Sequence, residues 1–580
     1  MAEKFYTAER QIQALISLLK QYGIKKIIAS PGTTNLTFVA SVQQDPFFEI
    51  FSAPEERSGA YMAVGMAEES NESVVITCTG ATASRNYLPA LTEAYYRKLP
   101  VIAVTATQPK GRVGQLVPQV IDRAVLPLDT NVYSYNLPVV KDEADFREAV
   151  IYINEALHHL TMNGGGPVHI NMETSYSSDF SVKELPEVLK INFYDSLQGL
   201  PEIPVGKIGI FVGSHSLMND ELTSAIDEFC EAYDAALFCD DTSNYYGKFK
   251  IQYPLLLSQD NWHCNTADLS LMIYLGEVSG AYSHPSAKMI WRVNTDGMIR
   301  SVFGAPDSVF KMEELDFFNY YKTRGNRQSD SFVKELNSEL DGLFESIPED
   351  LPFSNVWAAK TATPLLPSDS VLNLGILNSL RAWNYFRLPE GVVSYSNVGG
   401  FGIDGAISTT IGGALAKPDK LHFLVVGDLA FFYDMNSLGN RHLPSNIRIL
   451  LVNNGRGTEF RNYNHPGFLF GENADDYIAA GGHYGNQSKD LVRHYAEDLG
   501  FIYLSASNKE EFLQNIETFT DSKTLEKPIL LEVFTTQKDE NDAVFTMRNL
   551  RKGTQTMAQN LIRKTIGPKG VQVVKKIIGK

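Results

Sequence analysis

The chain has 580 residues, 44% of them hydrophobic and 21% charged, as is usual for a globular protein of about three or four domains. A formal net charge of −17 argues against nucleic acid as a partner, and no apolar run reaches the 18 residues of a transmembrane segment. The first ten residues are too polar for a signal peptide and the four cysteines form no CxxC pair, so we expect a cytoplasmic protein without disulfides or zinc.

The first part of the chain alternates helical and strand patterns. A helix pattern spans residues 8–22. Strand candidates follow at residues 26–30, 74–78, 101–105 and 168–172. Each leads into small or turn-forming residues and then a helical pattern, which predicts a doubly wound parallel sheet in a first domain, residues 1–195.

The same alternation occurs twice more. A linker-like segment at 196–204 opens a second, smaller α/β domain, residues 196–350, with strand candidates at 207–212, 236–240, 269–275 and 287–293. A joint near 349–354 precedes a third domain, residues 351–545, with strand candidates at 391–395, 421–426, 447–452 and 528–533. The predicted fold class is therefore α/β, with three consecutive Rossmann-like parallel-sheet domains.

A basic tail, residues 546–580, follows the third domain. Residues 551–580 contain eight Lys or Arg and no acid. The tail is either a lid, a surface-binding appendage or a solvated extension, and Gly567-Pro568 interrupts any continuous helix in it.

Two apolar runs of the third domain end in polar side chains. Asp428 follows the run 421–426, and Asn454 follows the run 447–452. With a crossover helix at 435–442, the two strands are parallel and both side chains emerge at the carboxyl edge of one sheet. A carboxylate, an amide oxygen and a backbone carbonyl such as that of Arg456 suit Mg²⁺ with two phosphate oxygens and a water. In the alternative to a metal site, Asp428 is only a helix N-cap and Asn453-Asn454 only a turn. The occurrence of both polar ends at this spacing on two strands disfavours that alternative.

A glycine-rich turn at 399–402 lies between a strand pattern and a helix pattern at 404–416. Small residues there let the backbone approach a phosphate or an aromatic ring. A simple tight connection explains such a turn equally well.

Three motifs resemble those of the thiamine-diphosphate-dependent decarboxylases and carboligases. They are PEERSGAYMAVGMA at 54–67, GDL at 427–429 and NN at 453–454. The resemblance covers about residues 7–540 and implies the order pyrimidine-binding (PYR), central and diphosphate-binding (PP) domains. Within that family the pattern is most similar to the menaquinone-pathway synthases that join 2-oxoglutarate to isochorismate (SEPHCHC synthases). The segments that carry this similarity are SPG at 30–32, YLPALTEA at 87–94, SNVGGFGIDG at 396–405 and GDLAFFYDMNSL at 427–438.

The resemblance implies thiamine diphosphate and Mg²⁺ as cofactors and assigns roles to individual residues. Glu56, chosen over Glu55 by its spacing to Gly65, matches the glutamate that hydrogen-bonds the aminopyrimidine N1′, a role suited to a buried carboxyl with a raised pKa. Gln119 matches a glutamine facing the thiazolium, or is a loop residue. Asp428, Asn454 and the backbone of Arg456 match the metal ligands. Further cofactor neighbours are Asn378, Ser379, Gly400, Gly402, Ile403 (an apolar wedge under the cofactor, or a core residue), Gly427, Leu429 and Ala430.

The implied reaction is decarboxylation of a 2-oxo acid and transfer of the acyl-anion equivalent to an acceptor, forming a C–C bond. The alternatives are a decarboxylase that releases an aldehyde and a true SEPHCHC synthase. A nicotinamide oxidoreductase is disfavoured because no GxGxxG follows the first strand. A homodimer or homotetramer is implied, with Glu56 of one subunit serving Asp428 and Asn454 of another.

The positions that carry cations in the synthases are occupied by uncharged residues in this chain, namely Thr34, Ala281, Trp383 and Val398. A synthase without those cations would leave substrate carboxylates unpaired, so we expect a neutral pocket and a short donor such as pyruvate. The residues expected to line it are Thr33, Thr34, Asn35, Thr82, Trp383 and Phe401.

Overall fold

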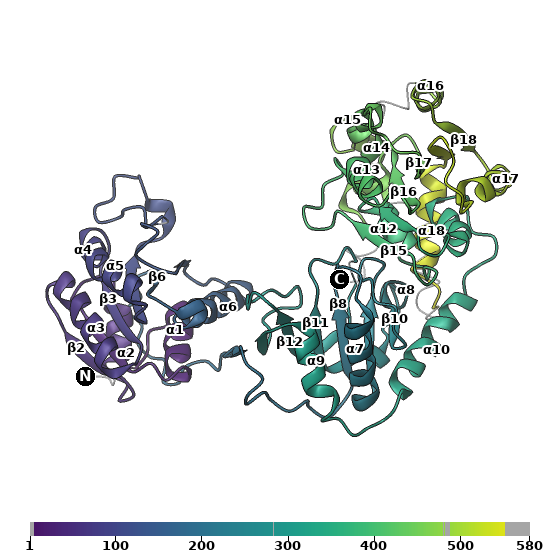
Figure 1. Ribbon diagram of the computed structural model, residues 1–580. Coiled ribbons are helices and arrows are strands. Elements are labelled where there is room, and N and C mark those ends of the chain that lie inside the picture. Colours follow the sequence, from purple (N-terminus) through teal and green to yellow (C-terminus); the bar gives the residue numbers. More distant parts are fainter. Residues whose placement is uncertain (1–4, 124, 282, 480, 482–487, 552–580) are drawn as a thin grey trace, which may run out of the picture. The chain divides into compact units, whose positions relative to one another are not determined.

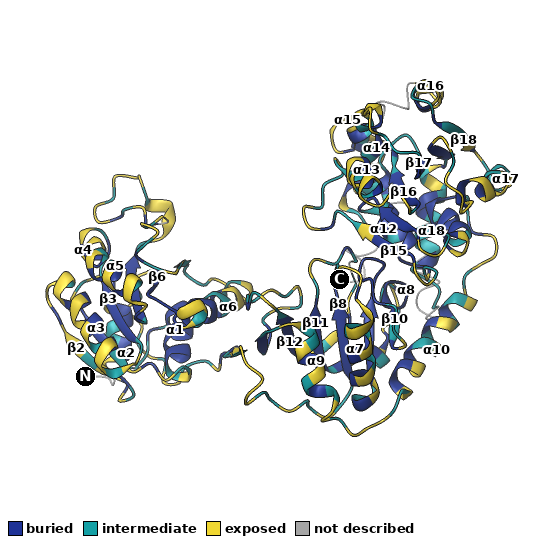
Figure 2. Ribbon diagram, in the orientation of Figure 1, coloured by how far each residue is buried: buried dark blue, intermediate teal, exposed yellow. Residues whose placement is uncertain are grey.

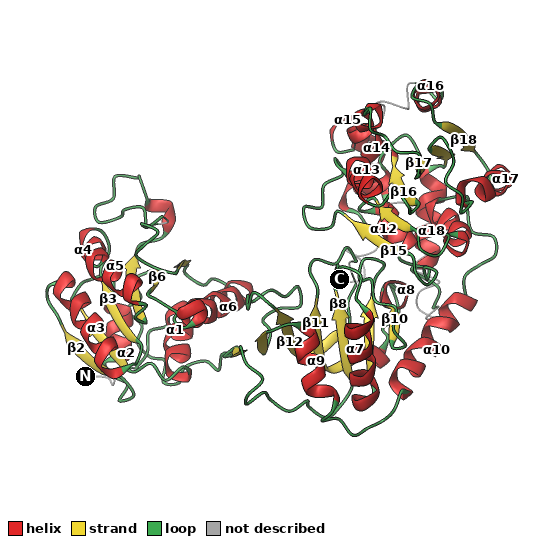
Figure 3. Ribbon diagram, viewed as in Figure 1, coloured by secondary structure: helices red, strands yellow, loops and turns green. Residues whose placement is uncertain are grey.

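The computed structural model describes residues 5–123, 125–281, 283–479, 481 and 488–551. The chain divides into two compact units, residues 1–196 with 290–311, and residues 197–289 with 312–580. Three parallel sheets with interleaved helices run through it (Figures 1 and 3), which confirms the predicted α/β fold class. None of the described helices is long and apolar enough to cross a membrane.

The first sheet has the strand order β2-β1-β3-β4-β6-β5. Its strands are β1 (Lys26–Ala29), β2 (Glu49–Ser52), β3 (Val74–Cys78), β4 (Val101–Thr107), β5 (Tyr133–Leu137) and β6 (Val168–Glu173). Its helices are α1 (Arg10–Gln21), α2 (Leu36–Val42), α3 (Glu56–Ser70), α4 (Thr82–Asn86), α5 (Leu88–Arg97) and α6 (Glu143–His159).

Two apolar clusters hold this sheet between its helices, as the buried strands in Figure 2 show. One packs α1, α2 and α6 against one face, and the other packs α3, α4 and α5 against the opposite face. Helix α1 buries Ile12, Leu15, Ile16 and Leu19, which share one side at the helical repeat. The carboxyl ends of the strands are thereby left to the loops, where ligands bind in such folds.

The second sheet has the order β10-β9-β8-β11-β12-β13-β7. Its strands are β7 (Asn192–Tyr194), β8 (Ile208–Val212), β9 (Ala235–Cys239), β10 (Lys250–Gln252), β11 (Asp268–Leu275), β12 (Ser286–Asn294) and β13 (Ser308–Lys311), and its helices α7 (Asp220–Tyr233), α8 (Tyr253–Leu257), α9 (Glu314–Lys322) and α10 (Ser331–Glu345). Strand β7 pairs with β13, although it precedes the expected boundary at residue 195. Three residues are too few for a periodic signal, so the pairing was not visible in the sequence.

The third sheet has the order β15-β14-β16-β17-β19-β18, which repeats the strand pattern of the first sheet. Its strands are β14 (Val371–Leu374), β15 (Val393–Ser396), β16 (His422–Gly427), β17 (Ile447–Asn453), β18 (Ile502–Ala506) and β19 (Ile529–Phe534). Its helices are α11 (Asn355–Ala362), α12 (Asn378–Trp383), α13 (Ala406–Ala416), α14 (Asp428–Asp434), α15 (Ala474–Tyr477), α16 (Leu491–Asp498), α17 (Lys509–Thr520) and α18 (Gln537–Met547).

The crossover between β16 and β17 differs from the expectation. The helix expected at 435–442 is wrong: α14 begins at Asp428, and residues Met435–Gly439 form a short 3-10 helix. Phe431 and Phe432 of α14 are buried in the core of this sheet, which draws the helix to the end of the strand. Helix α18 extends to Met547 into the predicted tail, of which residues 552–580 lie outside the described part of the chain.

Candidate functional site

Asp428 lies at the carboxyl edge of the third sheet, directly after β16. The register pairs Gly427 with Val452, so Asp428 and the Asn453-Asn454 pair leave the two neighbouring strands side by side. The carboxyl group of Asp428 is buried, and its Oδ1 accepts a hydrogen bond from the Leu429 N–H at 2.7 Å. Its Oδ2 is buried and has no hydrogen-bond partner. An unpaired buried carboxylate oxygen is costly, and it indicates that a ligand completes the site.

The turn after β17 faces this carboxylate. Burial raises the pKa of Asp428, whereas the backbone N–H groups of Leu429, Gly455, Asn454 and Arg456 act in the opposite direction. Gly457 has a φ of +57°, and a Cβ at this position would meet Leu429 Cδ1 at 2.3 Å. Only glycine allows the turn to pack against the start of α14 this closely.

The donor set fits a hard divalent cation. One carboxylate, the side-chain oxygen of Asn454 and a turn carbonyl are oxygen ligands of the kind that Mg²⁺ takes together with phosphate. Asn454 and Arg456 line a cavity of about 510 Å³ together with Thr535 and Lys538. The described residues contain no group of three or more His, Cys, Asp or Glu side chains suited to a metal.

Three other predicted cofactor residues meet in one small hollow beside the same edge. Gly402, Ile403 and Ala430 line it, with the ends of β14 and β15 on its other side. Phe401 has a φ of +53°, which is strained for a residue with a side chain. Gly400 is exposed and has no atom near its missing Cβ, and Gly427 likewise has open space around it.

Asn378 and Ser379 are the first two residues of helix α12. The preceding Leu377 has φ +66°, a second strained position at this edge. The amide of Asn378 hydrogen-bonds the side chain of Thr458 at 3.3 Å and that of Asn462 at 3.2 Å, whereas Ser379 is buried. These contacts join α12 to the chain that follows Asn454.

In the first unit, Glu55 and Glu56 have different environments. Glu55 caps helix α3, with its Oε2 accepting from the Ser58 N–H at 2.8 Å and from the Ser58 hydroxyl at 2.6 Å. Glu56 is half-buried, and its Oε2 accepts from Asn86 Nδ2 at 3.3 Å. The capping role therefore falls to Glu55, and the Glu56 carboxyl contacts Asn86 of α4 instead.

Gln119 lies on the loop after β4, exposed and with φ +65°. Its backbone oxygen is 3.1 Å from where a Cβ of Gly80 would be, so this loop packs on the turn after β3. Burial raises the pKa of the Cys78 thiol to about 12, and both the Arg123 guanidinium, which lowers it, and the Glu56 carboxylate, which raises it, are close enough to act. The loop and the start of α3 therefore converge on the end of β3.

Comparison with known proteins agrees with this geometry. Residues 10–126 match the thiamine pyrophosphate enzyme, N-terminal TPP binding domain. The chain carries the N-terminal domain of a thiamine pyrophosphate enzyme. Thiamine diphosphate is accordingly its cofactor.

Curated relatives extend the similarity of this thiamine pyrophosphate enzyme along most of its length. It is 29% identical to a 2-succinyl-5-enolpyruvyl-6-hydroxy-3-cyclohexene-1-carboxylate synthase of Bacteroides thetaiotaomicron, over 92% of this chain and 97% of the relative. Proteins of the same name from Bacteroides fragilis and Desulfotalea psychrophila are 28% and 27% identical, covering 92% and 91% of this chain and 98% of each relative.

Sequence reasoning missed several buried polar groups of the enzyme. Glu532, in the middle of β19, accepts from Asn453 Nδ2 at 2.6 Å and from the Tyr503 hydroxyl at 2.8 Å, and so holds the end of β17 in place. The only signal for it is an acid within an apolar strand. Glu540 on α18 is fully enclosed, and burial raises its pKa to about 7, with Asp428 adding to the effect.

Arg123 is a further such group. Its Nη2 donates to the Ala106 carbonyl at 3.1 Å, while its Nε and Nη1 are buried without partners. Three residues expected to line the substrate pocket are instead enclosed by the protein, Thr34 (4% exposed) among them. The indole of Trp383 is 1% exposed and donates to Asn355 Oδ1 at 3.2 Å, and Asn35 is 0% exposed and donates to the Ser30 carbonyl.

Proposed function

We propose that this thiamine-diphosphate enzyme decarboxylates a 2-oxo acid and joins the remaining acyl group to an acceptor carbonyl or alkene. The unpaired Oδ2 of Asp428, placed beside the Asn454 turn, carries the proposal, because it is a ready ligand for the metal of a bound diphosphate. Similarity to proteins named as synthases over about nine-tenths of the chain supports C–C bond formation over simple decarboxylation.

In this proposal each half of the cofactor has its own protein anchor. Asp428, Asn454 and the carbonyl of Arg456 hold Mg²⁺ and the diphosphate, with Gly427, Leu429, Asn378 and Ser379 around them. Ile403, Gly402 and Ala430 form the apolar support of the rings, with Gly400 beside them. Glu56 exchanges a proton with the aminopyrimidine ring, and Gln119 faces the reacting centre. Bound thiamine diphosphate supplies the carbon nucleophile and the electron sink for loss of CO₂.

We further propose the domain division PYR, central and PP at residues 1–195, 196–350 and 351–545, with β7 assigned to the central sheet, and a homo-oligomer whose subunits share each site.

Two alternatives remain within the same class. A decarboxylase would protonate the acyl-anion equivalent and release an aldehyde. A true SEPHCHC synthase is favoured by the names of the relatives but not by the uncharged Thr34, Ala281, Trp383 and Val398.

The test is an assay of the purified enzyme with thiamine diphosphate, Mg²⁺ and a set of 2-oxo acids, with and without aldehyde and ketone acceptors. We expect CO₂ release from a short 2-oxo acid and, when an acceptor is present, a coupled product in equal amount. Release of a free aldehyde with every acceptor would favour the decarboxylase. Absence of CO₂ release from every 2-oxo acid would refute the proposal.

A further inference from the structure

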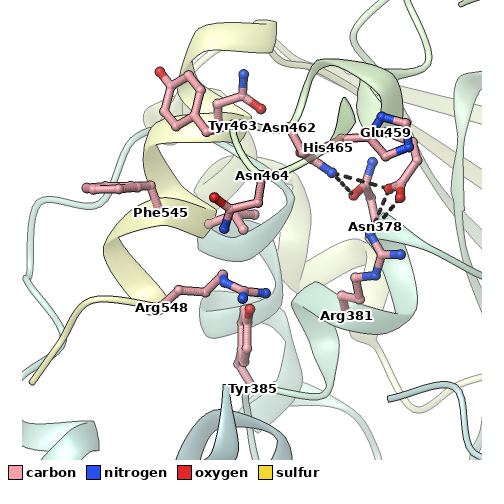
Figure 4. A pocket seen from close by; sticks show the side chains of 12 residues that line it. Asn378, Arg381, Tyr385, Glu459, Asn462, Tyr463, Asn464, His465, Phe545 and Arg548 are labelled. Carbon is pink, nitrogen blue, oxygen red and sulfur yellow. Dashed lines mark hydrogen bonds and ion pairs between the residues drawn. The ribbon is translucent and has the colours of Figure 1, made fainter. Parts of the chain in front are cut away.

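A second cavity, of about 400 Å³, is lined by Asn378 and by residues of the segment 459–465, which follows Asn454 in the chain (Figure 4). It lies between α12, the 3-10 helix Thr458–Arg461 with the loop that follows it, and the end of α18. Its volume is within the usual range for a small-molecule site. Because Asn378 is both a wall of this cavity and an expected neighbour of the cofactor, a ligand here would lie next to the expected cofactor site.

Both arginines of this cavity are already neutralised. Arg381 Nη1 donates to the two carboxylate oxygens of Glu459 at 2.7 and 3.0 Å. Arg548 donates through Nη2 and Nε to Asp260 Oδ1 at 2.6 and 2.9 Å. Figure 4 shows Arg381 turned towards Glu459 on one side of the cavity and Arg548 beside Tyr385 on the other. A guanidinium group whose charge is already paired with a carboxylate attracts a further carboxylate less than a free one does.

The remaining polar groups of the cavity are neutral amides, hydroxyls and an imidazole. Asn541 is 3% exposed, its Nδ2 donates to the Arg461 carbonyl at 2.8 Å, and its Oδ1 is buried without a partner. This oxygen can accept a hydrogen bond from a ligand hydroxyl. His465 Nδ1 accepts from the Gly467 N–H at 2.9 Å, which in the neutral ring leaves Nε2 as a donor.

One wall of the cavity is apolar. Val544 and Phe545 on α18 form it, and the Phe545 ring lies edge-on to Tyr463 with centroids 6.0 Å apart. The cavity therefore combines hydrogen-bond donors and acceptors, no net charge and a C–H-binding surface. The hydrogen-bonding groups suit the hydroxyls of a compact hydroxylated carbon chain, and the apolar wall suits its C–H groups.

We propose that this cavity binds the acceptor, and that the acceptor is a neutral polyhydroxylated carbonyl compound. The inference rests on the proposed function and names its second substrate class. In the proposed reaction the 2-oxo acid loses its carboxyl group as CO₂, and its C2 carbon bonds to the carbonyl carbon of the acceptor. The acceptor oxygen takes one proton and becomes a hydroxyl. No oxidant or reductant is consumed.

The experiment compares two four-carbon aldehydes with pyruvate as donor: D-erythrose, which is neutral and hydroxylated, and succinic semialdehyde, which carries a carboxylate. We expect the wild-type enzyme to have the higher kcat/KM for D-erythrose. Glu459→Gln removes the carboxylate that pairs with Arg381 and should lower the preference for D-erythrose by at least about tenfold, the effect of one charged hydrogen bond. The double variant Arg381→Gln with Glu459→Gln restores neutrality and should restore the preference.

Glu339→Gln is the matched control, because it breaks an Arg–Glu pair of the same kind (Arg551 Nη2 to Glu339 Oε2, 2.7 Å) away from the cavity. It should leave the preference unchanged. Binding is also read without turnover, by saturation transfer from the protein to erythritol, which Asn541→Leu should weaken and Glu339→Gln should not.

Three results separate the possible failures. A wild-type preference for succinic semialdehyde, with CO₂ release from pyruvate intact, would overturn the neutral acceptor and leave the proposed function standing. An equal change of preference in Glu459→Gln and Glu339→Gln would overturn the placement of the acceptor in this cavity. No CO₂ release from any 2-oxo acid would overturn both proposals.

Discussion

At the scale of single residues, the site depends on one carboxylate that no protein donor satisfies on one of its two oxygens. Asp428 is 4% exposed, and its Oδ2 has no partner. A group of this kind is tolerated in a folded protein when a ligand pairs with it.

We therefore expect Asp428→Ala to abolish binding of thiamine diphosphate in the presence of Mg²⁺, because the metal loses its carboxylate ligand and the diphosphate charge is poorly neutralised. Titration calorimetry measures this directly. Asp419→Ala, which removes an exposed carboxylate from the turn before β16, is the control. Unchanged affinity in Asp428→Ala would reject the metal assignment.

Substitutions of the two neighbouring glutamates, Glu55 and Glu56, should have different effects on the cofactor. Glu56→Gln is expected to bind the cofactor but to slow exchange of the cofactor C2 proton by about 10²-fold or more, as for loss of a general acid or base. Glu55→Gln should leave exchange nearly unchanged, because Glu55 serves as the cap of α3 through Ser58. Deuterium exchange at C2, followed by NMR, distinguishes the two variants. Slower exchange in Glu55→Gln than in Glu56→Gln would assign the catalytic role to Glu55 instead.

At the scale of elements, the loop after β9 joins the second sheet to the third within one unit. The Asp241 N–H donates to Asn384 Oδ1 at 2.7 Å, and its Oδ1 accepts from Gln252 Nε2 at 2.7 Å. Burial raises the pKa of Asp241 to about 8; Lys250 and the Gln252 hydrogen bond oppose the shift, and Asp240 adds to it.

This raised pKa predicts the sign of a pH effect. The folded state binds the Asp241 proton more tightly than the unfolded chain, so its stabilisation is fully present below about pH 4 and is lost as the pH rises towards 8. Asp241→Asn should remove this loss, so that its urea midpoint exceeds that of the wild type at pH 8 by more than at pH 5. A difference in urea midpoint between Asp241→Asn and the wild type that is the same at pH 5 and pH 8 would contradict the assignment.

At the scale of the whole molecule, the proposed sharing of each site between subunits is testable by complementation. Glu56→Gln and Asp428→Ala proteins should each be inactive, but mixed subunits place one intact site in each heterodimer. After unfolding, mixing and refolding we expect recovery of about a quarter of the wild-type activity, from random pairing in a two-fold dimer. A site built within one chain would show no recovery.

The choice of substrate also belongs to the whole molecule. We expect no measurable condensation of 2-oxoglutarate with isochorismate, because Thr34, Ala281, Trp383 and Val398 supply no cations. Each missing charged hydrogen bond should cost about 1.5–3 kcal/mol, so two of them weaken binding by about a hundredfold or more. Turnover with kcat/KM of about 10⁴ M⁻¹s⁻¹ or higher would show the substitution argument to be wrong.

The sequence by itself determined the features that depend on short stretches of chain. Apolar runs of strand length predicted β16 and β17, and their ends brought Asp428 and Asn454 to one sheet edge. The motif spacing separated Glu56 from Glu55 before the cap of α3 was visible. Such signals can be read from the sequence because hydrophobic period, segment length and the residues at segment ends are local properties.

Only the tertiary structure decided what depends on contacts between distant residues. The pairing of β7 with β13, the enclosure of Trp383 and the Glu532–Asn453 hydrogen bond join residues that are far apart in sequence. The neutral cavity is a further case, because Arg381 and Glu459 are separated by 78 residues and Arg548 and Asp260 by 288. A charge in a sequence does not reveal its partner, and the partner determines whether that charge is free to bind a substrate.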